Sequence, residues 1–151
     1  MALRYKHVEA ALAEVANAKP KDIGAFRAKL RHLRNIGLPR LPSPGSGQPI
    51  AYSRQQALEM LLAMELGKMG QAPKSAVLLA QSIARQAPYG QRAGKDCYVT
   101  LSAAEPRYTT AFGLSGLSKM MATAPDVCLI INVSACVRKL DGALDRAELH
   151  G

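Results

Sequence analysis

The chain has 151 residues and a mass of 16.1 kDa, enough for one domain or for one small domain with an appendage. Hydrophobic residues make up 48% of the chain, which excludes wholesale disorder, although only 5% of the residues are aromatic and none is Trp. The formal net charge of +9 favours a polyanionic partner, such as nucleic acid or an anionic membrane surface.

The positive charge is concentrated at one end of the sequence. Residues 1–54 hold ten Lys or Arg and three Asp or Glu, so they carry +7 of the total +9. Residues 55–151 hold ten bases and eight acids and are close to neutral. This asymmetry indicates a localised binding surface; the alternative is that the charge serves only solubility.

Two classes of protein are disfavoured by simple patterns. The longest apolar run, Val127–Ile131, is far below the roughly 18 residues of a membrane span, and the first 17 residues lack the apolar core of a signal peptide. Cys97, Cys128 and Cys136 form no CxxC pair and have no His at ligand spacing, so we expect buried thiols, no metal and a cytoplasmic protein. We also expect no membrane association and no cofactor.

The first third of the chain is typical of two helices joined by a short turn. Val8, Leu12 and Val15 predict a helix over residues 3–18, which Pro20 ends. Asp22 is the expected N-cap of a second helix over 22–36, in which Phe26, Leu30 and Leu33 repeat at helical spacing. Gly37 stands at the expected stop of that helix.

Four prolines and two glycines within residues 39–49 predict a loop, followed by a short β-like segment at 50–52. Ser53 is the expected N-cap of a third helix over 54–69, which Gly70 ends, and a fourth helix is predicted over 74–86. We interpret residues 87–95 as a linker between a first domain at 1–86 and a small α/β region at 96–151.

The last third changes character and predicts strands as well as helices. We expect a strand over 97–102, a short helix over 114–122 and a last helix over 135–147 capped by Ser134. The apolar run 127–133 is typical of a strand covered on both faces. Tyr108–Thr110 are interpreted as loop residues. The predicted fold class is α+β: a mainly α-helical winged helix-turn-helix followed by a small α/β dimerisation region.

The second helix carries the densest group of candidate binding residues. Its spacing places three arginines on one face beside the apolar stripe and Lys29, His32 and Asn35 on the opposite side. Arg can read guanine, Asn can read adenine, and Lys can neutralise phosphates. The candidate DNA contacts are Lys21, Arg27, Lys29, Arg31, His32, Arg34, Asn35, Arg40, Tyr52 and Arg54. The alternative is an ordinary amphipathic helix with a solvated basic face.

Several short motifs over about residues 3–86 resemble one known family. Leu33-Arg34-Asn35-Ile36-Gly37-Leu38-Pro39, a Gly-bearing loop, Tyr52-Ser53 and Leu66-Gly67-Lys68-Met69-Gly70 are similar to the MerR-type winged helix-turn-helix. The resemblance implies that helix 22–36 reads the major groove and that a wing at 38–52 contacts the backbone. Gln55-Gln56 replaces the family's acidic residue, and neither its metal-binding cysteines nor its long coiled-coil helix follows, so metal sensing is not implied.

The function we predict is sequence-specific binding of double-stranded DNA by a homodimeric bacterial-type transcription regulator, acting as a repressor. The alternatives are a non-specific nucleoid or RNA-binding protein, and a protein-interaction module or anti-activator whose basic helix meets an acidic partner. An enzyme is not expected, because His7, His32 and His150 have no evident Ser or Cys partner. Asp141 and Asp145 are interpreted as part of a solvated helix face. The sequence identifies no effector ligand.

Overall fold

The computed structural model describes residues 3–39, 51–88, 94–102, 107–124 and 128–149, and its fold is α+β and mainly helical. The elements are β1 (Leu3–Arg4), α1 (Tyr5–Val15), the 3-10 helix η1 (Pro20–Asp22), α2 (Ile23–Asn35), β2 (Ala51–Tyr52), α3 (Arg54–Lys68), α4 (Pro73–Ala84), β3 (Cys97–Ser102), β4 (Tyr108–Phe112), α6 (Gly113–Ala122), β5 (Cys128–Asn132) and α7 (Val133–Leu149).

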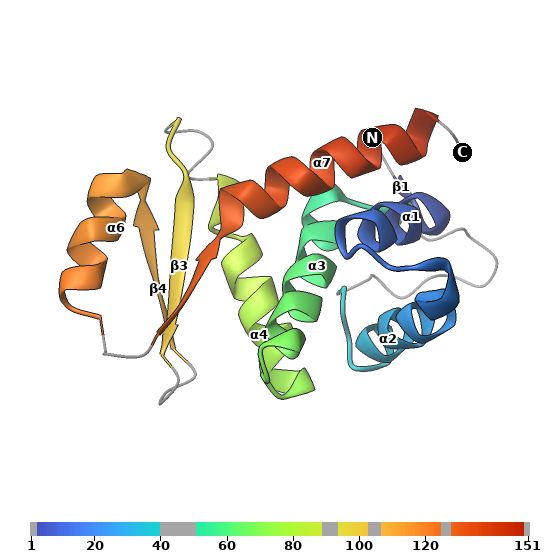
Figure 1. Cartoon of the computed structure of the whole chain (residues 1–151), viewed down its shortest axis with the longest axis horizontal. Helices are drawn as coiled ribbons and strands as arrows, with labels where there is room; N and C mark the ends of the chain where they lie inside the picture. Colours follow the sequence, from blue (N-terminus) through green and yellow to red (C-terminus); the bar gives the residue numbers. More distant parts are fainter. Residues whose placement is uncertain (1–2, 40–50, 89–93, 103–106, 125–127, 150–151) are drawn as a thin grey trace.

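The elements form successive layers along the long axis of the molecule (Figure 1). Helix α6 lies at one end, the three-stranded sheet comes next, α4 and α3 follow, and α1 and α2 form the other end. Helix α7 runs across these layers from the sheet to α1. The basic second helix is therefore at the opposite end of the molecule from α6.

Helix α3 is the centre of the larger helical layer, and its sequence explains this position. An unbroken run of buried side chains extends from Ala57 to Met64, so α3 has no wide solvent face in this segment. Ser53 accepts a hydrogen bond from the backbone N–H of Gln56, and the Gln56 side chain accepts one from the Ser53 N–H. This capping box satisfies two free N–H groups at the start of α3 and confirms Ser53 as the N-cap.

Two glycines end helices in the left-handed backbone conformation. Gly37 has φ +94° after α2, and the N–H of Leu38 bonds to the carbonyl of Leu33 at 3.0 Å. Gly70 has φ +86° after α3, and the N–H of Gln71 bonds to the carbonyl of Leu66 at 3.1 Å. Residues with a Cβ adopt this conformation only at a cost, so both predicted helix stops are confirmed.

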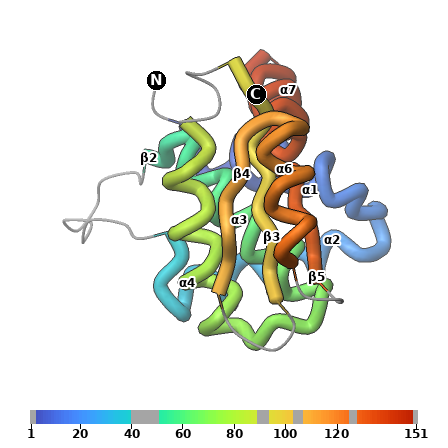
Figure 2. The backbone as a smooth tube through the Cα atoms, turned by 90° about the vertical axis from the view of Figure 1, so that its left-hand side faces the viewer, coloured from blue at the N-terminus to red at the C-terminus, as the bar shows by residue number. Residues whose placement is uncertain are grey.

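Two antiparallel sheets complete the fold. Strands β1 and β2 form a small sheet that pairs Leu3 with Tyr52. The second sheet has the order β4-β3-β5, with β3 antiparallel to both neighbours. Helix α6 connects β4 to β5 across the outer face of this sheet (Figure 2). Strand β3 is central, and its Val99 and Leu101 belong to the same buried cluster as the helices.

The structure corrects four local predictions. Tyr108–Thr110 lie in strand β4 rather than in a loop, because they pair with β3. Strand β5 is an edge strand whose Ile130 is 42% exposed, so it is not covered on both faces. Residues 3 and 4 form β1 rather than the start of a helix. Ser134 does not cap α7: its hydroxyl accepts a bond from the Cys97 N–H, while Asn132 accepts one from the Ala135 N–H at 2.9 Å.

Helix α7 joins the predicted C-terminal region to the N-terminal helices. It packs against both α1 and α3, and its Leu140 and Leu144 are fully buried. The predicted division into domains at residues 87–95 remains a prediction, and residues 89–93 of that segment lie outside the described residues. The packing of α7 nevertheless places part of the last third of the chain on the N-terminal helices.

Candidate nucleic-acid interface

Helix α2 separates an apolar face from a polar one. Phe26, Leu30 and Leu33 are buried against the rest of the molecule, as their spacing predicts. The other polar and small side chains of the helix, from Gly24 to Asn35, are exposed. Lys21 precedes this helix in η1 and is also exposed. The helix is therefore anchored along one side and open to a ligand along the other.

Two of its arginines are held by α1. The Nε atom of Arg27 donates to Glu9 Oε1 at 2.6 Å, although the Arg27 side chain stays 59% exposed. The guanidinium carbon of Arg34 lies 4.9 Å from the centre of the Tyr5 ring, which is a cation–π contact. Glu9 neutralises the charge of Arg27, whereas Arg34 keeps its full charge.

Three other basic residues of η1 and α2 have no such partner within the described residues. Among the described residues, no ion pair involves Lys21, Lys29 or Arg31. Arg31 also lies on the outward side of α2, in line with Gly24, Ala28 and Asn35 at helical spacing, so Arg31 and Asn35 share one stripe and do not lie on opposite sides of the helix as predicted. The outermost stripe of the helix thus begins with the small residues Gly24 and Ala28 and ends with the polar residues Arg31 and Asn35.

The structure contradicts the prediction for one residue, Tyr52, and leaves those for Arg54 and Arg40 as predictions. Tyr52 is only 1% exposed and packs beside Tyr5, with ring centres 5.9 Å apart. Burial raises the pKa of its hydroxyl group. Tyr52 therefore holds β2 against α1 and cannot face DNA. Arg40 lies outside the described residues.

Arg54 has ion-pair partners within the chain, although its side chain stays 45% exposed and its predicted DNA contact remains a prediction. Its guanidinium donates to Asp141 at 2.8 Å and to Asp145 at 2.5 Å, and Glu148 lies 3.8 Å away. These hydrogen bonds raise the pKa of Arg54. Asp141 and Asp145 are consequently not a merely solvated pair, because they fasten α7 to the start of α3.

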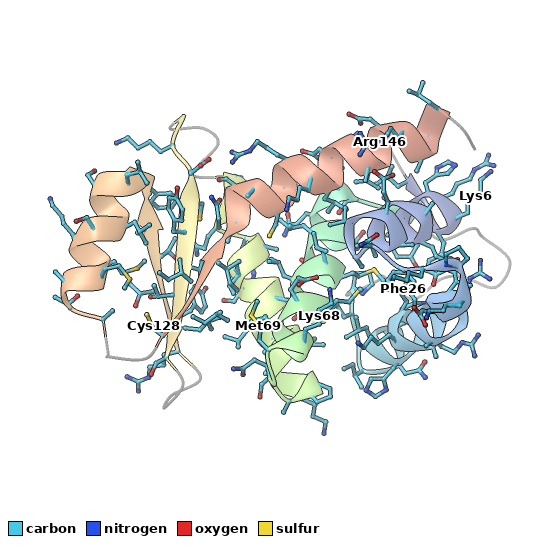
Figure 3. All side chains as sticks on the ribbon, in the orientation of Figure 1. Lys6, Phe26, Lys68, Met69, Cys128 and Arg146 are labelled. Atoms are coloured by element: carbon cyan, nitrogen blue, oxygen red, sulfur yellow. The ribbon has the colours of Figure 1, made fainter. Side chains whose placement is uncertain are left out.

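A groove beside Lys29 adds residues that the sequence did not single out. One hollow of about 320 Å³ is lined by Phe26, Lys29, Met64 and Lys68, among others. An adjoining hollow of about 440 Å³ runs past His32 to the turn between α3 and α4. Figure 3 labels Phe26 and Lys68, which lie on the two helices that border the first hollow. Lys68 also bonds to Glu65 at 2.7 Å. Because Lys68 is far from α2 in the sequence, its position beside Phe26 and Lys29 could not be predicted from local patterns.

Chemistry of other kinds has little support in the described part of the chain. No group of three or more His, Cys, Asp or Glu there could hold a metal ion. Burial raises the pKa of the Cys97 thiol to about 11 and also raises that of the half-buried Cys136, which favours the protonated, less nucleophilic form of both thiols. None of the described helices has both the length and the apolar character needed to cross a membrane.

The chain was compared with models of protein families and with curated protein sequences, and neither comparison found a match. The interface must therefore be judged from its own geometry and charge.

Proposed function

We propose that the chain binds double-stranded DNA through the exposed side of α2 and regulates transcription. The observation that carries this proposal is the stripe Gly24, Ala28, Arg31 and Asn35, which faces outward on a helix anchored by its other side. A Cβ added at Gly24 would meet nothing within 4 Å, so the surface is open there. Small residues allow a helix backbone to approach DNA closely, and Arg and Asn can each form paired hydrogen bonds with a base.

The neighbouring elements support the same assignment. Helices α1 and α2 follow one another across the short 3-10 turn η1, the order found in helix-turn-helix proteins. Lys21 in η1 and Lys29 in α2 are exposed lysines of the same end of the molecule and would neutralise phosphates. Arg27 and Arg34 are oriented by Glu9 and Tyr5 and would contact the backbone rather than bases.

In this proposal the bound site is occluded, so the protein acts as a repressor in the cytoplasm. The predicted wing at 38–52 falls largely on residues 40–50, outside the described residues, and carries no weight here. Repression by occlusion requires only affinity and specificity for the site. Activation by DNA distortion would need additional contacts that bend the duplex.

The test is a binding titration with DNA selected from a randomised duplex library and with a random duplex. We expect Arg31→Ala to weaken binding to the selected duplex by about 1–3 kcal/mol, and binding to the random duplex much less. Lys29→Ala should weaken both about equally, because a phosphate contact carries no sequence information. Lys119→Ala is the matched control, since it removes one positive charge from α6 at the far end of the molecule.

Three results would each count against the proposal. Absence of binding to any duplex at low salt would refute nucleic-acid binding altogether. Equal losses for Arg31→Ala and Lys119→Ala would show that only total charge matters. Binding without preference for any selected sequence would instead favour a non-specific nucleoid or RNA-binding protein.

The groove beside Lys29 favours one second candidate, a protein-interaction module. Its apolar lining from Phe26 and Met64 and its basic residues Lys19, Lys29 and Lys68 suit an acidic amphipathic segment of another protein. Lys68→Ala, at an exposed residue of the groove, should weaken that binding and leave sequence-specific DNA binding intact. An equal effect of Lys68→Ala on both, with the fold preserved by circular dichroism, would assign the groove to the DNA interface.

A further inference from the structure

The end of the molecule opposite α2 is apolar and exposed. Among the described residues, half of the six large hydrophobic side chains that are exposed lie on α6 and β5: Leu114 (74%), Met121 (41%) and Ile130 (42%). Leu114 and Met121 are seven residues apart and so share one side of α6. Figures 1 and 2 place α6 and the sheet together at this end.

Strand β5 also has an open edge. Within the described residues, the sheet order β4-β3-β5 gives β5 a paired strand on one side only. The other edge strand, β4, is joined to α4 by a hydrogen bond of 2.7 Å between the side chains of Ser82 and Tyr108, whereas β5 is bonded to a helix at its last residue, where the Asn132 side chain accepts from the Ala135 N–H of α7. Edge strands are normally protected by charged residues or Pro, and β5 (Cys128–Asn132) contains neither. This edge can therefore accept another strand.

The charge distribution indicates which strand would be added. Lys119 is the one charged residue within α6 and β5, so two copies of this surface do not repel each other. The α2 end carries most of the excess positive charge and would repel its own copy. Ile130 is the middle residue of β5. Two copies of β5 that pair antiparallel about Ile130 are therefore related by a two-fold axis, as in a symmetric dimer.

We propose that a second copy of this chain occupies this surface. In the resulting dimer β5 pairs antiparallel with the partner's β5, so that Ile130 lies opposite the partner's Ile130. The two sheets of three strands then form one sheet of six strands. A two-fold axis perpendicular to the sheet keeps both α6 helices on the same face, where Leu114 and Met121 face the partner helix.

The experiment is sedimentation equilibrium of the full chain without DNA. We expect the wild type to be a dimer, and Ile130→Lys and Leu114→Lys each to raise the dissociation constant at least about 10-fold, because each places two unpaired charges in the symmetric interface. Leu78→Lys is the matched control: Leu78 is 68% exposed on α4, outside the proposed interface, and its change should leave the dimer intact. Circular dichroism checks that each variant is folded.

A wild type that stays monomeric at about 100 µM overturns the inference, because a continuous strand pair with buried apolar side chains should give a dissociation constant well below that concentration. A dimer that survives Ile130→Lys, or one that dissociates equally on Leu78→Lys, also overturns it. The inference names the partner of the proposed regulator but does not depend on DNA. A dimer that binds no duplex would refute the proposed function alone, and a monomer that binds DNA specifically would refute the dimer alone.

Discussion

Arg54 offers the sharpest test of how α7 is held, because its guanidinium bridges α3 to two carboxylates about one helical turn apart on α7. The perturbation is Arg54→Ala. It removes the bonds to Asp141 and Asp145 and leaves these two acids and Glu148 on one side of α7 without their shared cation. Arg54 was a predicted DNA contact, so the same variant separates a structural role from a binding role.

The magnitude follows from the exposure of the partners. The side chains of Arg54, Asp141 and Asp145 are 45%, 40% and 61% exposed, so each pair is worth only about 0.2–1 kcal/mol. Unmasked repulsion between the carboxylates adds about 0.2–0.5 kcal/mol. Removing the cation from the first turn of α3 offsets this loss by about 0.3 kcal/mol, because a positive charge at a helix N-terminus interacts unfavourably with the helix dipole. The net loss is about 1 kcal/mol.

The assay is urea unfolding at low salt and at about 1 M salt, where the screening length falls to about 3 Å and the loss should shrink. Arg31→Ala is the control, because it makes the same truncation on an exposed helix where no ion pair is lost. A cycle with Asp145→Asn should show a coupling of at least about 0.5 kcal/mol. Unchanged stability together with a sequence-specific loss of DNA affinity would refute this reasoning and restore Arg54 as a DNA contact.

Two further predictions concern stability. Gly37→Ala should destabilise the chain by about 1 kcal/mol, because Gly37 has φ +94°, although a Cβ there would meet nothing within 4 Å. Gly24→Ala in α2 should instead stabilise it by up to about 1 kcal/mol. Urea unfolding checks both, and equal signs would contradict the argument that backbone conformation decides the difference. Burial raises the pKa of Glu59, so the folded protein binds this proton more tightly than the unfolded chain, and the associated stability is lost as pH rises above the ordinary pKa of Glu. Glu59→Gln should therefore raise the free energy of unfolding at pH 7 but not near pH 4. A lower free energy of unfolding at pH 7 would show instead that the Glu59 charge is well compensated.

Local patterns predicted most elements but not their partners. Helical spacing located α1, α2, α3 and α4 to within a few residues, because each buries a stripe that the sequence displays. Strand β4 was missed because its pairing with β3 is a tertiary interaction, while Tyr108-Thr109-Thr110 alone has little alternation of apolar and polar residues. The candidate site was likewise predictable only where local sequence patterns determine it. Exposure of α2 followed from its periodicity, but Arg54 pairs with residues 87 and 91 positions away, and no local pattern reveals such a contact.

The error over β5 has a physical origin that bears on assembly. A continuous apolar run indicates that a strand is covered on both faces. It does not indicate whether the covering residues belong to the same chain or to another copy. In the described structure β5 is an edge strand with Ile130 exposed, so its composition is more apolar than its own chain requires. A second copy at this edge would reconcile the composition of β5 with its position.

The connection from β5 to α7 links the proposed strand pair to the end of the molecule that carries α2. Asn132 ends the strand and Val133 begins the helix, with no intervening loop. Helix α7 has 17 residues and is about 25 Å long, and Arg146 near its far end bonds to Glu14 of α1. A strand pair fixed at β5 would therefore hold each α1–α2 unit at a set distance from the two-fold axis. A regulator built in this way would read two half-sites at one spacing, because the connecting helix is rigid and fastened at both ends.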